Sequence, residues 1–390
     1  LANSKLGRVS YTSADSADSV SDFRRILRRI DYKLLIAALG IIVYSLIIIS
    51  SATHVNTPSD DRFWYVQRQG IFAVINILAA IFFMNFDYRG LQPYGKKLYI
   101  FNLIMLAAVM LFGHAARGAQ RWIQIGPISL QPSEFSKLIM IICLASVLEE
   151  RVGALNSLQD LLPVAVYIGV PFILVLKQPD LGTSLVFMAI FFGMILVCGI
   201  NLRLLLGIFA VGIASLPILW HFLKEYQKTR ILVFIDPNID PLGSGYHIIQ
   251  SKIAIGSGML FGKGLFEGTQ SQLNFLPENH TDFIFAVVGE EFGFVGAVIL
   301  LVLYLIVMWR GIQIAKEARD TFGRLLAVGI TSMLAFHVLV NVGMTTGIMP
   351  VTGIPLPLMS YGVSALTTNI MAIAILMNVH MRKQKLTFLR

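Results

Sequence analysis

The chain has 390 residues, of which 56% are hydrophobic and only 14% are charged, and its formal net charge is +9. Soluble domains carry roughly a quarter charged residues, so this composition excludes a soluble globular protein and indicates a polytopic membrane protein. Nucleic acid is not needed to explain the positive charge, because basic residues beside a bilayer are attracted to anionic inner-leaflet lipids. The two cysteines lie in separate apolar runs, with no CxxC pair and no disulfide framework.

Ten apolar stretches are candidates for membrane-spanning helices, which need about 20 residues each. They cover residues 34–50, 70–86, 98–112, 135–148, 161–176, 183–198, 204–223, 283–309, 325–342 and 366–378. We therefore expect an all-α membrane protein with three parts. These are a flexible N-terminal tail (residues 1–30), one ten-span domain (31–380) and a C-terminal tail (381–390).

The basic residues predict the orientation of these spans. An even number of spans places both termini on one side, and 20 of the 31 lysines and arginines lie in the tails and loops of that side. Because basic residues gather in cytoplasmic loops, we expect both termini to be cytoplasmic. The 59 residues 224–282 then form one long extracellular loop. Its short apolar groups, separated by glycines, predict short amphipathic or re-entrant helices.

The stretches that resemble motifs all fall on the predicted outer face. They are residues 121–137 (RWIQIGPISLQPSEFSK), 177–182 (KQPDLG), the end of the long loop at Asp282, and 345–362 (TTGIMPVTGIPLPLMSYG). The cytoplasmic loops, in contrast, are short connectors. Loops gathered on one face of a rigid scaffold are a common place for function.

Asp282 closes a polar stretch and opens one of the most hydrophobic segments of the chain. It either caps the helix that follows or serves as a functional carboxylate at the membrane boundary. Glu134 and Lys137 are three residues apart, so they form either a local ion pair or a cation held ready for an anionic substrate. Asp180 fits ordinary turn chemistry, and with Lys177 it also adds charge beside a candidate cleft.

The segment 345–362 holds three prolines and three glycines and cannot form a regular helix. Flanked by two spans, it is expected to dip back into the protein, because broken backbone at membrane depth is tolerated only where it is buried or lines a cavity. Ser360 would offer a hydroxyl there. His337, alone in the ninth span, fits a core histidine better than a ligand.

The stretches GAQRWIQIGPISLQPSEFSKL, KQPDLGTSLVF, GTQSQLNFLPENHTDFIFAVVGEEFGF and GIMPVTGIPLPLMSYG occur in this order and resemble the SEDS family (shape, elongation, division and sporulation). The sequence QSQLNFLPENHTDFIF is most similar to that of the elongation branch of the family, the RodA type. The resemblance covers about residues 30–380. The family usually ends this last motif closer to PFxSYGGSS, whereas this chain has PLMSYGVS.

This resemblance implies a peptidoglycan glycosyltransferase that polymerises lipid II outside the cytoplasmic membrane for cell elongation and rod shape. It places the family's essential aspartate at Asp282 and its glutamate and lysine at Glu134 and Lys137. We expect Asp282 to be the general base, with Lys137, Arg121 and Lys177 supplying positive charge to the departing diphosphate. We assign Glu134, Asp180 and Ser360 to substrate binding as well, Glu134 by orienting Lys137 or by binding a divalent cation.

The metal requirement and the partners stay open at this point. The diphosphate is expected to leave with the help of these cations alone or with a divalent cation, Mg²⁺ or Mn²⁺, for which the sequence shows no ligand set. The resemblance implies a class B penicillin-binding protein as transpeptidase partner, alongside other elongation-complex membrane proteins. Two alternatives remain, a lipid II flippase that uses the intramembrane Glu290 and Glu291, and a non-catalytic scaffold for a penicillin-binding protein.

Overall fold

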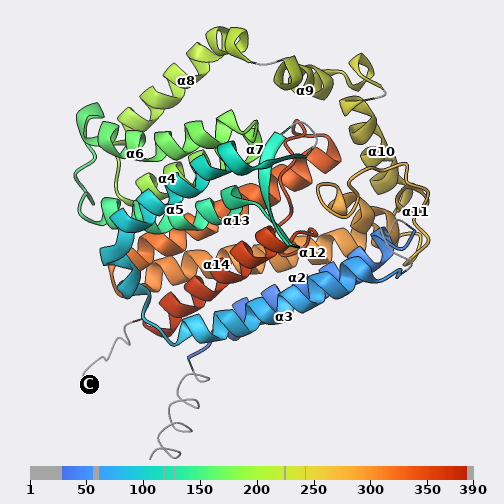
Figure 1. The fold of residues 1–390 in the computed structure, drawn as a ribbon, viewed down its shortest axis with the longest axis horizontal. Helices are drawn as coiled ribbons and strands as arrows, with labels where there is room; N and C mark the ends of the chain where they lie inside the picture. Colours follow the sequence, from blue (N-terminus) through green and yellow to red (C-terminus); the bar gives the residue numbers. More distant parts are fainter. Residues whose placement is uncertain are drawn as a thin grey trace, which may run out of the picture.

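The computed structural model describes residues 29–55, 61–116, 119–126, 128–223, 225–241 and 243–383. The described residues form ten long helices, most of which run side by side across Figure 1, whereas α8 lies at the top of the view, tilted and set apart from the others. They are α2 (Tyr32–Ala52), α3 (Trp64–Met84), α4 (Gly95–Phe112), α5 (Pro132–Glu149), α6 (Leu158–Lys177), α7 (Leu181–Val197), α8 (Leu202–Phe222), α12 (Ile284–Glu317), α13 (Thr321–Thr346) and α14 (Val363–Met381).

These ten helices coincide with the ten predicted spans, so the predicted fold class is confirmed. Within the described residues, seven helices are long and apolar enough to cross a membrane, α4 being counted together with the 3-10 turn η1 (Tyr88–Tyr94) before it. The other three are α5, which carries Glu134, Lys137 and Glu149, and two helices with shorter apolar stretches, α7 and α8. The two predicted tails lie almost wholly outside the described residues.

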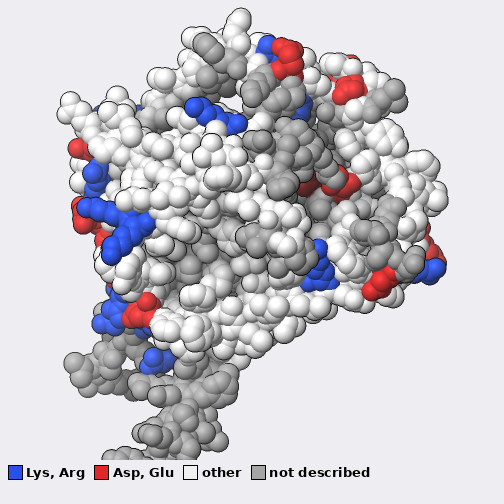
Figure 2. All heavy atoms as spheres, viewed as in Figure 1, with Lys and Arg blue, Asp and Glu red and all other residues white. Residues whose placement is uncertain are grey.

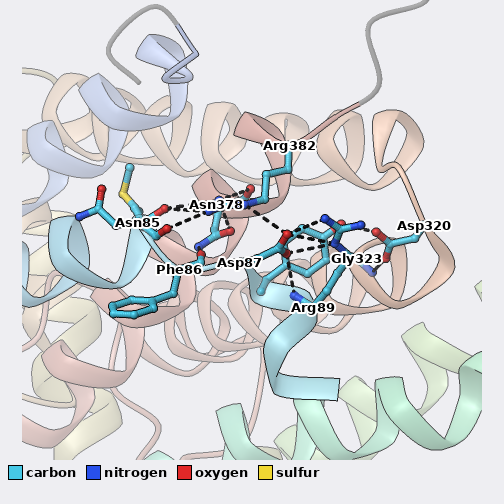
Figure 3. Close-up of polar contacts among 10 residues, drawn as sticks. Asn85, Phe86, Asp87, Arg89, Asp320, Gly323, Asn378 and Arg382 are labelled. Carbon is cyan, nitrogen blue, oxygen red and sulfur yellow. Dashed lines mark hydrogen bonds and ion pairs between the residues drawn. The ribbon is translucent and has the colours of Figure 1, made fainter. Parts of the chain in front are cut away.

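The two ends of the bundle differ in character. We call the end where α2 begins and α14 finishes the tail end, and the opposite end the loop end. At the tail end Asp31 caps α2 and pairs with Arg310 of α12 at 2.7 Å. Figure 3 shows a second polar network there, in which Asp87 accepts from Arg89 and lies 3.7 Å from Arg382. The guanidinium of Arg89 holds the pKa of the Asp87 carboxyl below its usual range.

At the loop end, residues 225–283 contain short helices, as predicted (Figure 1). These are α9 (Glu225–Ile235), η2 (Pro237–Ile239), α10 (Ser244–Ser257) and α11 (Thr269–Gln272). A three-stranded antiparallel sheet between α4 and α5 was not expected. Its strands are β1 (His114–Ala116), β2 (Ala119–Ile125) and β3 (Ile128–Leu130), with Gln124 opposite Ser129. The sheet lets the chain turn back into α5 with its backbone groups paired.

α12 is interrupted at Gly293, and this break anchors the long loop. Gly293 has φ 62° and ψ −157°, a conformation that essentially only glycine adopts. The freed backbone groups pair with residues 259–264: Lys263 N donates to Glu290 O at 3.0 Å, and Phe294 N donates to Met259 O at 2.9 Å. The kink therefore arises because a second backbone segment takes the place of part of the hydrogen bonding within the helix.

Residues 347–362, the re-entrant segment, dip into the bundle as predicted. Ile354, Leu356, Leu358 and Met359 are all buried. Carbonyl oxygens of this segment accept hydrogen bonds from side chains of the surrounding helices. The donors are Ser45 to Met359 O (2.6 Å), Gln69 to Ser360 O (3.2 Å), Tyr304 to Pro357 O (2.5 Å), Asn341 to Ile354 O (2.8 Å) and His337 to Pro355 O (3.1 Å).

We predict that Gly293→Ala destabilises the protein. A Cβ there would lie 2.4 Å from the backbone nitrogen of Gly262, and the left-handed φ alone costs about 1–2 kcal/mol for a residue with a side chain. Thermal unfolding of the purified protein in detergent measures the effect. Gly169→Ala in α6 is the control, because a Cβ there meets nothing within 4 Å, and it should leave the melting temperature unchanged or higher. Equal melting temperatures for the two variants would contradict this account of the kink.

Candidate active site

Asp282 lies at the loop end, in a turn just before α12. The helix begins at Ile284 with Phe283 at the N-cap position, so Asp282 directly precedes the cap. Phe283 N donates to Glu278 O at 3.1 Å, which closes the turn. Asp282 is partly exposed, whereas Phe283 and Ile284 are buried. The carboxylate therefore sits at the boundary between the packed interior and the outside.

The re-entrant segment holds this turn by two hydrogen bonds, and α13 holds it by a third. Ser360 Oγ donates to Thr281 O at 2.6 Å, Tyr361 N donates to His280 O at 2.9 Å, and Asn341 Nδ2 donates to Asp282 O at 2.9 Å. Ser360 Oγ also accepts from Leu356 N at 2.8 Å. The Ser360 hydroxyl thus makes two hydrogen bonds within the protein. It was predicted to contact substrate; that prediction stays untested, and the geometry supports a positioning role for this hydroxyl.

A cation from the long loop reaches the neighbourhood of Asp282. A Cβ placed on Gly353 would lie 3.4 Å from Asp282 Oδ2, so the carboxylate faces the backbone of the re-entrant segment. Arg230 of α9 donates to the carbonyl of the preceding residue, Thr352, at 3.5 Å. Sequence reasoning missed Arg230, because 52 residues of loop separate it from Asp282. Its one signal is a basic residue within an amphipathic stretch.

Glu134 and Lys137 form a buried ion pair in the first turns of α5. Lys137 Nζ lies 2.8 Å from Glu134 Oε1, and the two side chains are 2% and 4% exposed. Lys137 Nζ also lies 3.1 Å from His337 Nε2. The carbonyl of Pro355 can only accept a hydrogen bond, so His337 Nδ1 carries the proton and Nε2 accepts from the lysine. Of the two sequence readings, the local pair is therefore present, and it continues through His337.

This buried pair is linked to the Asp282 turn through α13. His337 and Asn341 are one helical turn apart, and they bind the carbonyls of the adjacent Pro355 and Ile354. Asn341 in turn binds Asp282 O. The predicted contact of Glu134 and Lys137 with substrate stays untested. In this arrangement they support the re-entrant segment from inside the bundle.

Asp180 caps α7 and joins two of the motif stretches. Its carboxylate accepts from Thr183 N at 3.2 Å and lies 3.7 Å from Arg121 Nη1. Gln131, at the N-cap position of α5, donates to Asp180 Oδ2 at 3.3 Å. Arg121 also donates to the carbonyls of residues 178 and 179. Asp180 was predicted to be an ordinary turn residue, and in the structure its side chain also caps α7.

The α7 end also touches the re-entrant segment. A Cβ on Gly182 would lie 2.8 Å from Ile354 Cγ1 and 3.0 Å from Thr352 O. Residues 177–182 and the Asp282 turn thus contact the re-entrant segment directly. Residues 121–137 are linked to it through His337 and Asp180. Lys177 differs from the other predicted site residues, because it is exposed on the last turn of α6.

Glu290 and Glu291 serve the long loop. Glu290 lies 2.8 Å from Lys263 Nζ and accepts from Gln270 N at 2.9 Å, and Glu291 accepts from Ser51 Oγ at 2.5 Å. Both are buried. Their contacts fasten residues 263–272 to α12 and α2, which is a structural use of carboxylates at this depth. Among the described residues no group of three or more His, Cys, Asp or Glu side chains could hold a metal ion.

We predict that Lys137→Met lowers the melting temperature strongly, because it leaves the buried Glu134 carboxylate without its cation, a loss worth about 3–5 kcal/mol. The double variant Glu134→Gln/Lys137→Met removes both charges and should recover most of the loss. Thermal unfolding in detergent measures both. If the double variant is no more stable than Lys137→Met alone, the two charges do not compensate one another.

Comparison with known proteins agrees with the resemblance in sequence. The family model for FtsW, RodA and SpoVE, described as "Cell cycle protein", matches residues 32–385. The chain is 43% identical over 360 residues to the peptidoglycan glycosyltransferase MrdB of Escherichia coli (strain K12), covering 92% of this chain and 95% of that protein. It is 40% identical over 354 residues to the stage V sporulation protein E of Bacillus subtilis (strain 168), covering 90% and 96%.

Two solved structures are similar over almost their full length. One comes from work on the structural coordination of polymerization and crosslinking by a peptidoglycan synthase complex; its TM-score is 0.77 at 32% identity, covering 90% of this chain and 97% of that one. The other is the rod shape determining protein RodA of Thermus thermophilus, with a TM-score of 0.68 at 30% identity, covering 91% and 98%. With its ten helices and four motif stretches in order, the chain belongs to the FtsW/RodA/SpoVE family, the SEDS proteins.

Proposed function

We propose that this protein is a peptidoglycan glycosyltransferase that polymerises lipid II into glycan strands for cell elongation. A relative that is 43% identical over almost the whole chain carries the name peptidoglycan glycosyltransferase. The single structural observation that supports the proposal best is the placement of Asp282. It is a partly exposed carboxylate at the membrane boundary, held by backbone hydrogen bonds on a buried segment.

In the proposed reaction Asp282 acts as the general base. Its carboxylate takes the proton of the acceptor sugar hydroxyl, and the hydroxyl oxygen bonds to the anomeric carbon of the donor sugar. The bond from that carbon to the lipid diphosphate breaks, and the diphosphate leaves with the electron pair. A general base must sit within about 3 Å of the proton it takes, so a rigid turn around Asp282 has direct value.

Positive charge must meet the departing diphosphate. Arg230 donates to the carbonyl of Thr352, the residue before Gly353. Lys177 is exposed at the loop end. Lys137 and Arg121 are engaged within the protein, by Glu134 and by Asp180 and its neighbours. Among the candidate cations, we therefore propose Arg230 as the main contact of the diphosphate. Lys137 keeps a role through the segment that positions Asp282.

A divalent cation would fit this arrangement as a bridge to the diphosphate. Magnesium is commonly bound by one or two carboxylates together with substrate phosphates, and Asp282 offers one such carboxylate. Bound there, Mg²⁺ or Mn²⁺ would add positive charge beside the leaving group. Glu134 is less suitable as a ligand, because its side chain is buried against Lys137.

We propose that the loop end faces outward and both tails face the cytoplasm. Of the 31 lysines and arginines, 20 lie in the tails and in the loops of the tail end. Lipid II would then reach Asp282 from the outer leaflet. A class B penicillin-binding protein is the proposed crosslinking partner, with other elongation-complex membrane proteins beside it. A similar structure belongs to a complex that joins polymerization to crosslinking.

The flippase alternative has less support in the structure. It needs polar groups along a path through the bundle, and Glu290 and Glu291 were its candidates. Both carboxylates are buried, and their contacts hold the long loop. The scaffold alternative gives Asp282 no chemical task, so one variant separates it from the enzyme.

Asp282→Asn should reduce polymerisation at least about 100-fold, because a general base contributes about 10²–10⁴-fold. The assay follows glycan chains made from lipid II by detergent-purified protein, in which no membrane has to be crossed. Asp61→Asn is the matched control, an exposed aspartate just before α3 whose Oδ1 accepts from Phe63 N. Normal polymerisation by Asp282→Asn protein that folds normally would rule out the base assignment.

We also expect a chelator to stop polymerisation and Mg²⁺ or Mn²⁺ to restore it, since the diphosphate leaves with negative charge that a divalent ion neutralises. The measurement is lipid II turnover after treatment with EDTA and dialysis, then with each ion added back. Full turnover in the metal-depleted sample would show that the protein's own cations are sufficient.

A further inference from the structure

An apolar pocket lies between α2, α3 and α14, away from the Asp282 turn. Its volume is about 280 Å³, and every residue that lines it is Ala, Ile, Leu or Met. Leu39 and Ile81 on its rim are 37% and 53% exposed, so the pocket opens to the outside of the bundle between α2 and α3. An opening with no polar lining at membrane depth accepts a hydrocarbon chain and rejects a polar molecule.

The pocket begins at the tail end and is shallower than one leaflet. Its helical lining runs from Leu35 to Ile42 along α2 and from Met84 back to Ile77 along α3, with Ile30 just before α2. Seven residues of helix rise about 10 Å. This is less than half of the roughly 30 Å hydrocarbon thickness of a bilayer. A partner's spanning helix would need the full thickness, so the depth favours one acyl chain.

Basic side chains surround the mouth of the pocket. Arg29 is exposed and directly precedes Ile30, which lines the pocket. Arg382 donates to the carbonyl of Met84, another lining residue. Figure 3 shows Arg382 beside the Asp87–Arg89 pair. Asp87 pairs with Arg89 and also lies near Arg382, so Arg382 has no carboxylate of its own among these contacts.

Several charged groups near the mouth act on the pKa of Arg382. Burial lowers the pKa of Arg382, and the negative charge of Asp87 opposes this. The positive charges of Arg89 and Arg29 lower it as well. In Figure 2 lysines and arginines also gather toward the left end of the molecule, the end at which α14 finishes in Figure 1. Two like charges held together are relieved by a bound anion.

We propose that this pocket is a binding site for an anionic phospholipid, whose acyl chain fills the space between α2, α3 and α14 and whose phosphate meets Arg29 and Arg382. The lipid comes from the leaflet at the tail end, whereas Asp282 lies at the loop end. It is therefore distinct from the substrate of the proposed reaction. Leu358 of the re-entrant segment forms part of the pocket wall, so the chain supports the segment that positions Asp282.

The test uses the full-length, delipidated protein in detergent, titrated with phosphatidylglycerol or with phosphatidylcholine of the same acyl chains, with bound lipid counted by native mass spectrometry. We expect tighter binding of phosphatidylglycerol. Arg29→Gln should weaken it about fivefold, the worth of one cation near an anionic headgroup, and should leave phosphatidylcholine unchanged. Lys96→Gln is the matched control, an exposed lysine on α4, which does not line the pocket. Equal binding of the two lipids, or an equal effect of Arg29→Gln and Lys96→Gln, would overturn the proposal.

A second pair of variants tests the pocket itself. Ala80→Leu and Ala374→Leu each place a larger side chain among the lining residues and should reduce binding of both lipids. Ala107→Leu on the exposed face of α4 is the control. Undiminished lipid binding by either filling variant that remains monodisperse would place the lipid elsewhere. Binding of a polyprenyl phosphate in preference to phosphatidylglycerol would also overturn the proposal.

Discussion

A segment of irregular backbone can lie inside a membrane protein only if its polar groups are paired with the protein, because hydrocarbon offers them no partner. The re-entrant segment meets this condition through side chains of four surrounding helices, α2, α3, α12 and α13, each of which donates to a carbonyl oxygen of residues 354–360. These donors include Ser45, Gln69 and Tyr304, which lie in three different spans. The segment is therefore a rigid internal support, and the Asp282 turn rests on it.

The same principle explains the second irregular feature, the break at Gly293. There the unpaired backbone of α12 bonds to residues 259–264, and Glu290 and Glu291 add side-chain contacts to the same loop. The long loop is thus fixed at one side by α12. At another side Arg230 of α9 reaches the re-entrant segment near Gly353. Both irregular features contribute to one result, a partly exposed carboxylate with a fixed backbone and a cation close by.

The buried Glu134–Lys137 pair is linked to the re-entrant segment by His337. A neutral histidine that donates to Pro355 O can accept from the lysine, so the pair is connected to the support of the Asp282 turn. A buried pair of this kind is weak evidence for stability, since removal of two charges from water is costly. Its value here is geometric, because it orients the ring that binds the re-entrant segment.

Composition and apolar periodicity alone determined the class of this protein, its ten spans and the presence of helices in the long loop, since the cost of burying polar groups in hydrocarbon acts on every span separately. Prolines and glycines marked residues 345–362 as irregular, and charge at a span boundary marked Asp282. Tertiary structure decided what the sequence left open. It placed Arg230 near Asp282, connected Lys137 to His337, gave Ser360 and Asp180 positioning contacts, and formed the short sheet before α5. The contacts of Arg230, Lys137 and Ser360 join residues 79 to 200 positions apart, so no local pattern records them.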